Sequence, residues 1–115
     1  MSRVALLVED DVVIRDGLKA LLTSLFQFEQ VYEAHNGVEA LRLLKWPIDI
    51  VITDVSMPDM NGLELVQELR RRGLDIPVIV VSGHADFSFA REALRLGTSD
   101  YLLKPVDRLE LGRAL

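Results

Sequence analysis

The chain has 115 residues, of which 50% are hydrophobic, and this is enough for one domain with a substantial core. Its net charge of −5 excludes the basic surface that nucleic-acid binding requires, so we expect this chain alone to bind no nucleic acid. The absence of Cys excludes disulfides and thiolate metal sites, and the short apolar runs exclude a signal peptide and a membrane span, which together favour a cytoplasmic location.

Five short apolar runs predict five β-strands. In chain order they are Arg3–Val8, Gln30–Ala34, Ile48–Thr53, Val78–Val81 and Tyr101–Leu103. The runs are rich in Val, Ile and Leu, a composition that is typical of parallel strands buried on both faces.

Helical patterns separate these runs, and capping residues mark their ends. The spacing of the first helix places on one face Ile14, Leu18, Leu21, Leu22 and Leu25. Asn36 and Asn61 are each followed by Glu three residues later, so both resemble the N-cap of a capping box. We expect further N-caps at Asp11, Asp86 and Asp107, and helix stops at Gly73 and Gly97.

Strand and helix alternate five times, which indicates an α/β fold with a parallel sheet and helices on both faces. Right-handed crossovers make the flavodoxin-like, doubly wound strand order 2-1-3-4-5 the simplest arrangement. We expect a single domain over residues 1–115. The last helix comprises only Asp107–Leu115, fewer than the typical ~11–12 residues, so we expect a truncated helix and an output domain outside this chain.

Residues that can take part in chemistry follow four of the five predicted strands, whereas the second strand, at the sheet edge, is followed by His35-Asn36 without an acid. Ligands of such sheets bind beyond the carboxyl ends of the strands, where the strand order reverses. The residues at those ends are Glu9-Asp10-Asp11, Asp54, Ser82-Gly83-His84 and Lys104-Pro105. Each alone is more often a turn former, a cap or a surface side chain; we assign Asp11 to capping, and His35 and His84 to loops. Their convergence on one crevice nevertheless favours a shared site.

The acids of this crevice suit a hard divalent cation. Crowded carboxylates raise one another's pKa, and a bound cation removes that repulsion. Oxygen ligands without Cys favour Mg²⁺. A carboxylate beside Mg²⁺ can attack a phosphoryl group and form an aspartyl phosphate, while the ion and a lysine neutralise the charge that develops on the phosphoryl oxygens.

The same residues resemble those of the receiver domain of bacterial two-component response regulators. The matching motifs are LLVEDD at residues 6–11, the acid in VITDVSMPDMNG at 51–62, VVSG at 80–83 and DYLLKP at 100–105. The resemblance extends from about Arg3 to Leu115. It implies a phosphoacceptor switch rather than an enzyme, in which Asp54 accepts a phosphoryl group from the phosphohistidine of a sensor histidine kinase.

The resemblance also implies a metal site, with one departure from the family. Mg²⁺ would be held by Glu9, Asp10, Asp54 and the backbone carbonyl of Ser56. The family's acid pair is usually Asp-Asp, and Glu9 is one methylene longer, which would let it reach the ion through water. Asp10-Asp11 is an alternative pair. We prefer Glu9-Asp10 because it aligns Ile14-Arg15 with the Ile-Arg of the family's first helix.

Further roles follow from the same resemblance. Ser82 and Lys104 would contact the phosphoryl group, Tyr101 would swing inward when Ser82 moves, and Pro105 would follow a cis peptide bond. The fourth helix, fifth strand and fifth helix would form the output face and a possible homodimer interface. Residues 84–107 also resemble receivers fused to AraC-type DNA-binding domains, which implies a parent transcription regulator.

Three other functions fit the residues of this chain less well. A phosphatase of the haloacid dehalogenase type needs a general-acid Asp two residues after the nucleophile, where this chain has Ser56. Flavin binding needs a Ser/Thr/Gly loop after the first strand, and acids at that place would repel the flavin phosphate. An inert receiver-like scaffold should lack some of Asp10, Asp54 and Lys104, and all of these are present.

Overall fold

The computed structural model describes residues 3–83 and 87–115. Within them the strands form one parallel sheet in the order β2-β1-β3-β4-β5, which confirms the predicted flavodoxin-like fold. The strands are β1 (Val4–Val8), β2 (Gln30–Ala34), β3 (Ile50–Asp54), β4 (Val78–Ser82) and β5 (Asp100–Leu103). Because β1, β3 and β4 are central, their side chains are buried on both faces of the sheet.

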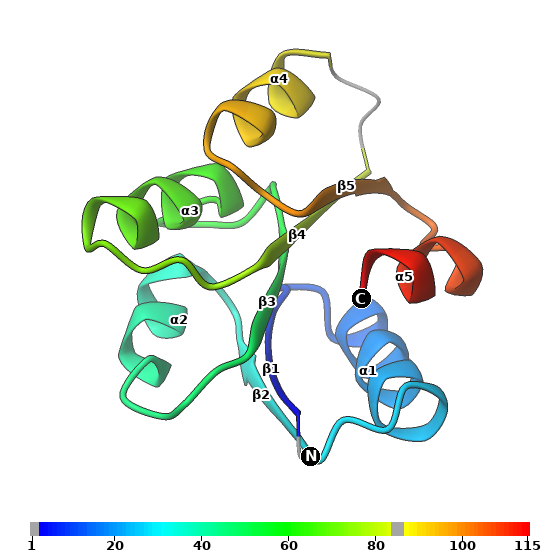
Figure 1. The fold of residues 1–115 in the computed structure, drawn as a ribbon. Helices are drawn as coiled ribbons and strands as arrows, with labels where there is room; N and C mark the ends of the chain where they lie inside the picture. The colour runs from blue at the N-terminus through cyan, green and yellow to red at the C-terminus, as the bar shows by residue number, and fades with distance from the viewer. Residues whose placement is uncertain (1–2, 84–86) are drawn as a thin grey trace.

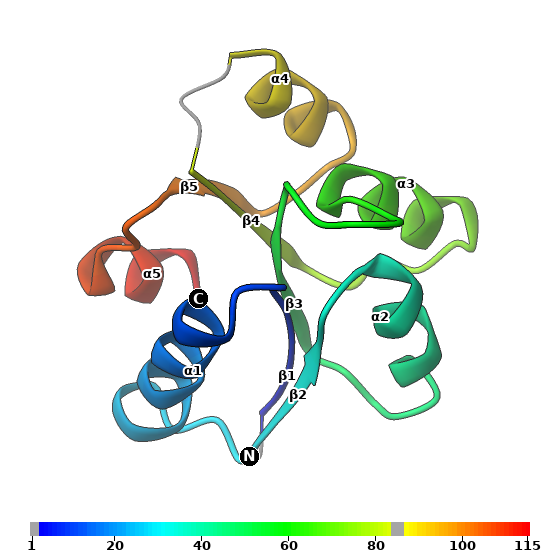
Figure 2. The ribbon, with the colours of Figure 1, turned by 180° about the vertical axis from the view of Figure 1, so that it is seen from behind.

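Helices cover both faces of the sheet. They are α1 (Val12–Ala20) with its π-helical extension η1 (Leu21–Leu25), α2 (Gly37–Leu43), α3 (Gly62–Arg71), α4 (Phe87–Arg95) and α5 (Arg108–Ala114). α1 and α5 lie on one face, and α2, α3 and α4 lie on the other (Figures 1 and 2). Each face has its own core, one around Leu22 and Leu111 and the other around Leu65 and Leu69. None of the described helices is long and apolar enough to cross a membrane.

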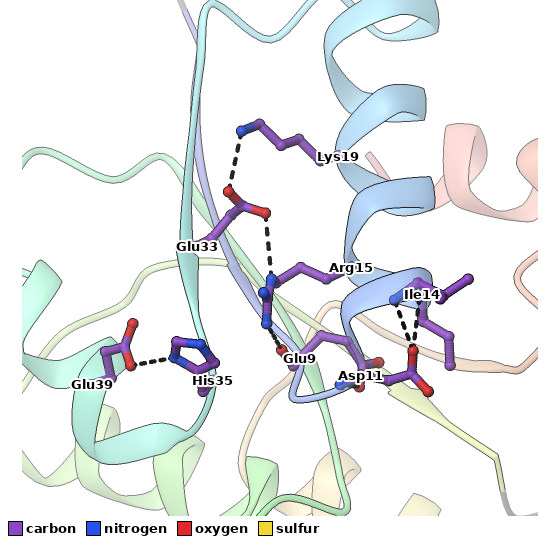
Figure 3. Close-up of polar contacts among 9 residues, drawn as sticks. Glu9, Asp11, Ile14, Arg15, Lys19, Glu33, His35 and Glu39 are labelled. Carbon is purple, nitrogen blue, oxygen red and sulfur yellow. Dashed lines mark hydrogen bonds and ion pairs between the residues drawn. The ribbon is translucent and has the colours of Figure 1, made fainter.

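Most of the predicted helix ends are confirmed. The Asp11 carboxylate accepts the N–H groups of Val13 and Ile14 at the start of α1 (Figure 3), and Asp107 caps α5 in the same way. Asn61 and Glu64 form the complete capping box expected at α3. Gly73 and Gly97, after α3 and α4, have φ angles of 76° and 72°, a left-handed backbone that glycine adopts without strain. Asp86, the N-cap predicted for α4, lies outside the described residues.

Two predictions about the helices are wrong. Leu25 was expected on the buried face of the first helix but is 48% exposed, because the chain widens into a π-helical turn that rotates it away. Phe26 packs against the core there. The capping box at α2 is only half formed: Asn36 accepts the N–H of Glu39, while the Glu39 carboxylate pairs with the exposed ring of His35 at 2.6 Å.

The third strand begins two residues later than the sequence predicts. Asp49 turns to accept the N–H of Val4 through its carboxylate at 2.7 Å, and the strand begins only at Ile50. At the other end Asp54 still pairs in register with Val81 of β4. The backbone of Asp54 is therefore held by the sheet itself.

Candidate functional site

Asp54 occupies the last position of β3, where the sheet fixes its backbone. Its side chain is only 6% exposed. The chain then turns, and the N–H of Gly62 donates to the carbonyl of Val55 at 2.9 Å. A Cβ atom at Gly62 would collide with the backbone carbonyl oxygen of Asp54. Only glycine therefore lets the start of α3 pack directly against the backbone of Asp54, a contact that the sequence alone did not reveal.

Glu9 and Asp10 leave β1 beside Asp54. Glu9 is 1% exposed and accepts the N–H of Asp11 at 3.2 Å, whereas Asp10 is exposed. One carboxylate oxygen from each of Glu9, Asp10 and Asp54 lies within 4.8 Å of the other two. Asp11 caps α1 instead of joining this cluster. Of the two acid pairs considered from the sequence, the structure thus places Glu9-Asp10 next to Asp54.

Lys104 binds two of these acids at once. It follows β5 and extends its ammonium group between them, with Nζ 2.7 Å from Glu9 Oε1 and 3.2 Å from Asp54 Oδ2. Its backbone N–H donates to the carbonyl of Ser82 at 2.8 Å, and its peptide bond to Pro105 is cis, as expected. Residues from β1, β3 and the end of β5 therefore meet at one point.

The burial of these charges is reflected in their pKa values. Burial raises the pKa of Glu9 above its ordinary value of 4.5, and the nearby charge of Asp54 adds to this rise, although hydrogen bonds from Lys104 and Asp11 oppose it. Burial alone would lower the pKa of Lys104, but its hydrogen bond to Glu9 and the charge of Asp54 outweigh that effect, and the net result is a raised pKa. The lysine is therefore held as a cation by the two acids.

The other predicted residues lie around this centre. Ser82 is buried at the end of β4, and Tyr101 of β5 is partly buried against the core beneath α2, α3 and α4. Ser56 is exposed and lines a surface pocket of about 440 Å³ together with Asp10. His35 is an exposed residue at the end of β2, and His84 lies outside the described residues.

The donor set of the cluster fits Mg²⁺. Three carboxylates offer oxygen atoms within a few ångströms of one another, with no nitrogen or sulfur donor among them. Hard oxygen donors of this kind, few in number and partly open to solvent, suit a magnesium ion that keeps some of its own waters. Asp10, the exposed member, opens onto the same pocket as Ser56.

One polar contact of the site was missed in the sequence. Arg15 of α1 donates from Nη1 to the backbone carbonyl of Glu9 at 2.8 Å, and its Nε lies 3.4 Å from the carboxylate of Glu33 on β2 (Figure 3). In the sequence, Arg15 served only to align the first helix with that of the family. No local pattern indicates that an arginine on a helix reaches back to a carbonyl six residues earlier.

Comparisons with known proteins agree with this geometry. Residues 5–115 match the family described as the response regulator receiver domain. The transcriptional regulatory protein HptR of Staphylococcus aureus is 38% identical over 105 residues, which cover 90% of this chain and 41% of HptR. The chain spans less than half the length of the first curated relatives that it matches.

Solved structures are similar over nearly the whole chain. The REC domain of AraT, a response regulator from Geobacillus stearothermophilus, is 39% identical with a TM-score of 0.84, covering 98% of this chain and 89% of that one. The CheX–CheY–BeF₃–Mg²⁺ complex from Borrelia burgdorferi matches with 28% identity and a TM-score of 0.89, over 97% of this chain and 85% of that one. The family match, the shared fold and the acid–lysine site together lead to one conclusion: this chain belongs to the family of response regulator receiver domains.

Proposed function

We propose that Asp54 accepts a phosphoryl group from the phosphohistidine of a sensor histidine kinase. The observation that carries this proposal is the position of Lys104 Nζ, 3.2 Å from Asp54 Oδ2, within a cluster of acids at the end of β3. A carboxylate oxygen of Asp54 attacks phosphorus and forms an O–P bond. The N–P bond of the donor breaks, and its electron pair stays on the imidazole, which takes up a proton.

Glu9, Asp10, Asp54 and the backbone carbonyl of Ser56 would hold Mg²⁺, which supplies positive charge against the phosphoryl oxygens when bound. Lys104 acts from between Glu9 and Asp54. Its ammonium group already contacts Asp54, so it can follow the new negative charge onto the phosphoryl oxygens. When Lys104 moves to the phosphoryl oxygens, it would leave Glu9, its present partner at 2.7 Å.

The phosphorylated state would then be read out through β4 and β5. Ser82 would donate its hydroxyl to a phosphoryl oxygen, and Tyr101 would move inward behind it. Shifting a population from 1:99 to 99:1 takes about 5.5 kcal/mol. Hydrogen bonds to charged groups contribute about 1.5–3 kcal/mol each, so bonds from Ser82 and Lys104 supply energy of the required order.

The kinase would dock beside the site, and the output would lie on α4, β5 and α5. An apolar pocket of about 490 Å³ between α1 and Pro105 opens next to Lys104, which offers an apolar surface for the donor protein. Leu94, Leu103 and Leu109 are exposed on the output face and would form a homodimer interface.

We place the chain in the cytoplasm, as the switch of a transcription regulator with an AraC-type output domain; HptR is named as a transcriptional regulator.

A phosphorylation assay tests the proposal. Acetyl phosphate with Mg²⁺ should add one phosphoryl group to the wild-type chain, seen by intact-protein mass spectrometry, and EDTA should prevent the addition. Asp54→Asn should remain unlabelled. Asp59→Asn is the matched control, because it removes an exposed carboxylate from the same loop and should label normally. Equal labelling of Asp54→Asn and wild type would exclude Asp54 as the acceptor.

A further inference from the structure

Glu9 lies one residue beyond the end of the strand ladder. β1 pairs with β2 and β3 only as far as Val8. The N–H of Glu9 still donates to the carbonyl of Ala34 at 3.0 Å, but its own carbonyl has no strand partner in register. Arg15 fills that place, with Nη1 2.8 Å from the Glu9 carbonyl oxygen (Figure 3). The backbone of Glu9 is thus held on both sides.

This bond also orients the next residue, Asp10. The carbonyl of Glu9 and the N–H of Asp10 belong to one planar peptide group, so a bond that fixes the Glu9 oxygen also fixes the direction in which the chain enters Asp10. The Asp10 side chain is exposed, and no side chain within residues 3–83 and 87–115 donates a hydrogen bond to it. Its placement beside Glu9 and Asp54 therefore depends on its backbone.

Arg15 is itself held and neutralised by β2. Its side chain is 12% exposed, and Glu33 lies 3.4 Å from its Nε, while Lys19 binds the other carboxylate oxygen of Glu33 at 3.1 Å. Nε is buried and makes no hydrogen bond with any residue that the structure describes, so its contact with Glu33 is an ion pair and not a directed bond. Glu33 offsets the positive charge of Arg15 next to a site that must accept a cation.

We propose that Arg15 is a positioning residue for the Mg²⁺ site: through the Glu9 carbonyl it fixes the peptide that carries Asp10 into the acid cluster. The inference rests on the proposed function, since it concerns the affinity of that same site for its ion. Residues that orient metal ligands without touching the metal typically change metal affinity about 10–100-fold when they are replaced.

The sign of the effect separates positioning from simple electrostatics. Arg15→Met removes a positive charge near the acid cluster, and charge alone predicts tighter Mg²⁺ binding. Loss of the bond to Glu9 predicts the opposite, a Kd for Mg²⁺ that rises about tenfold. Lys19→Met is the matched control: it removes a cation of the same helix and the same Glu33 partner, but Lys19 makes no bond to Glu9.

Isothermal titration calorimetry with Mg²⁺ measures the Kd of each folded protein, and thermal melts with EDTA measure stability separately. We expect weaker binding in Arg15→Met and unchanged binding in Lys19→Met. Arg15→Lys, which keeps the charge but loses the guanidinium fork, should also bind more weakly, and it serves if Arg15→Met does not fold. A role in stability alone would lower the melting temperature and leave Kd unchanged.

The outcomes distinguish this inference from the proposed function. Wild-type binding of Mg²⁺ together with an unchanged or lower Kd in both Arg15 variants overturns the positioning role and leaves the phosphoacceptor proposal standing. Absence of Mg²⁺ binding by the wild type overturns both. Weaker binding in Lys19→Met equal to that of Arg15→Met would assign the effect to the loss of their shared contact with Glu33 and overturn the role of the Glu9 carbonyl.

Discussion

Lys104→Met should destabilise the metal-free protein, because it leaves the buried carboxylate of Glu9 without its cation. The pair is closer to a buried than to a surface ion pair, since the Lys104 side chain is 17% exposed and that of Glu9 is 2% exposed. Surface pairs contribute about 0.2–1 kcal/mol, whereas removing one partner of a buried pair costs about 3–5 kcal/mol. We expect a loss of about 2–3 kcal/mol in the free energy of unfolding.

Urea denaturation near neutral pH measures this loss, and a double-mutant cycle assigns it. In the Glu9→Gln background only Asp54 remains as a buried acid beside Lys104, so Lys104→Met should then cost less than in wild type. Lys45→Met serves as a control, because Lys45 contacts only the ring of Trp46 in the contacts described and its loss should change stability little. Added Mg²⁺ should stabilise Lys104→Met more than wild type, since the ion replaces the missing positive charge.

The pH dependence of the same variant has a definite sign. The folded pKa of Glu9 lies above 4.5, so the folded state holds that proton more tightly than the unfolded state, and stability falls as the pH rises through this window. Lys104→Met removes a hydrogen bond that lowers this pKa and should raise it further. The stability difference between the two proteins should therefore shrink as the pH falls from neutrality towards 4.5. In the double-mutant cycle, an equal loss of unfolding free energy on Lys104→Met in wild type and in Glu9→Gln would refute the reasoning.

Two further predictions concern the acid cluster and its support. Asp10→Ala relieves carboxylate repulsion and should raise the melting temperature in EDTA, while the stabilisation by Mg²⁺, about 2.7 kcal/mol for wild type at a hundredfold excess over Kd, should vanish. A lower melting temperature with an intact Mg²⁺ response would contradict this. Gly62→Ala should cost about 1–3 kcal/mol by steric collision and slow the labelling of Asp54. Its control, Gly17→Ala, adds a methyl to open space on α1 and should stabilise by about 0.5–1 kcal/mol.

The main residues of the candidate site could be predicted from the sequence because the strand order determines which strand ends lie together. Glu9 and Lys104 are 95 positions apart, yet both follow strands whose carboxyl ends meet at the same edge of the sheet. Once the alternation of strand and helix is recognised, the polar residues that follow β1, β3, β4 and β5 are expected at the same edge of the sheet. Asp54 and Ser82 follow from their places at strand ends, and the caps Asp11 and Asp107 follow from the regularities of helix capping.

The contacts that the sequence missed depend on distances between elements. The π-helical turn that exposes Leu25 alters a helical period that the spacing of leucines cannot register. Glu39 has two possible partners, the backbone of Asn36 and the ring of His35, and only the end geometry of β2 decides between them. Arg15 reaches the Glu9 carbonyl because the first turn of α1, which carries it, follows the end of β1 after a short loop. These three contacts depend on how the helices and strands pack against one another, which the local sequence pattern does not specify.

Glu9 shows how a departure from the family pattern takes on meaning only in three dimensions. From the sequence alone, the extra methylene of Glu9 left open whether its carboxylate would bind a metal ion directly or through water. In the structure, that longer side chain turns one oxygen towards Lys104 and the other towards the N–H of Asp11. A cation entering the site must therefore compete with Lys104 for Glu9, and phosphorylation of Asp54 would draw Lys104 in the other direction. Lys104 contacts both Glu9, the proposed metal ligand, and Asp54, the proposed phosphoacceptor, so metal binding and phosphorylation should be coupled through it.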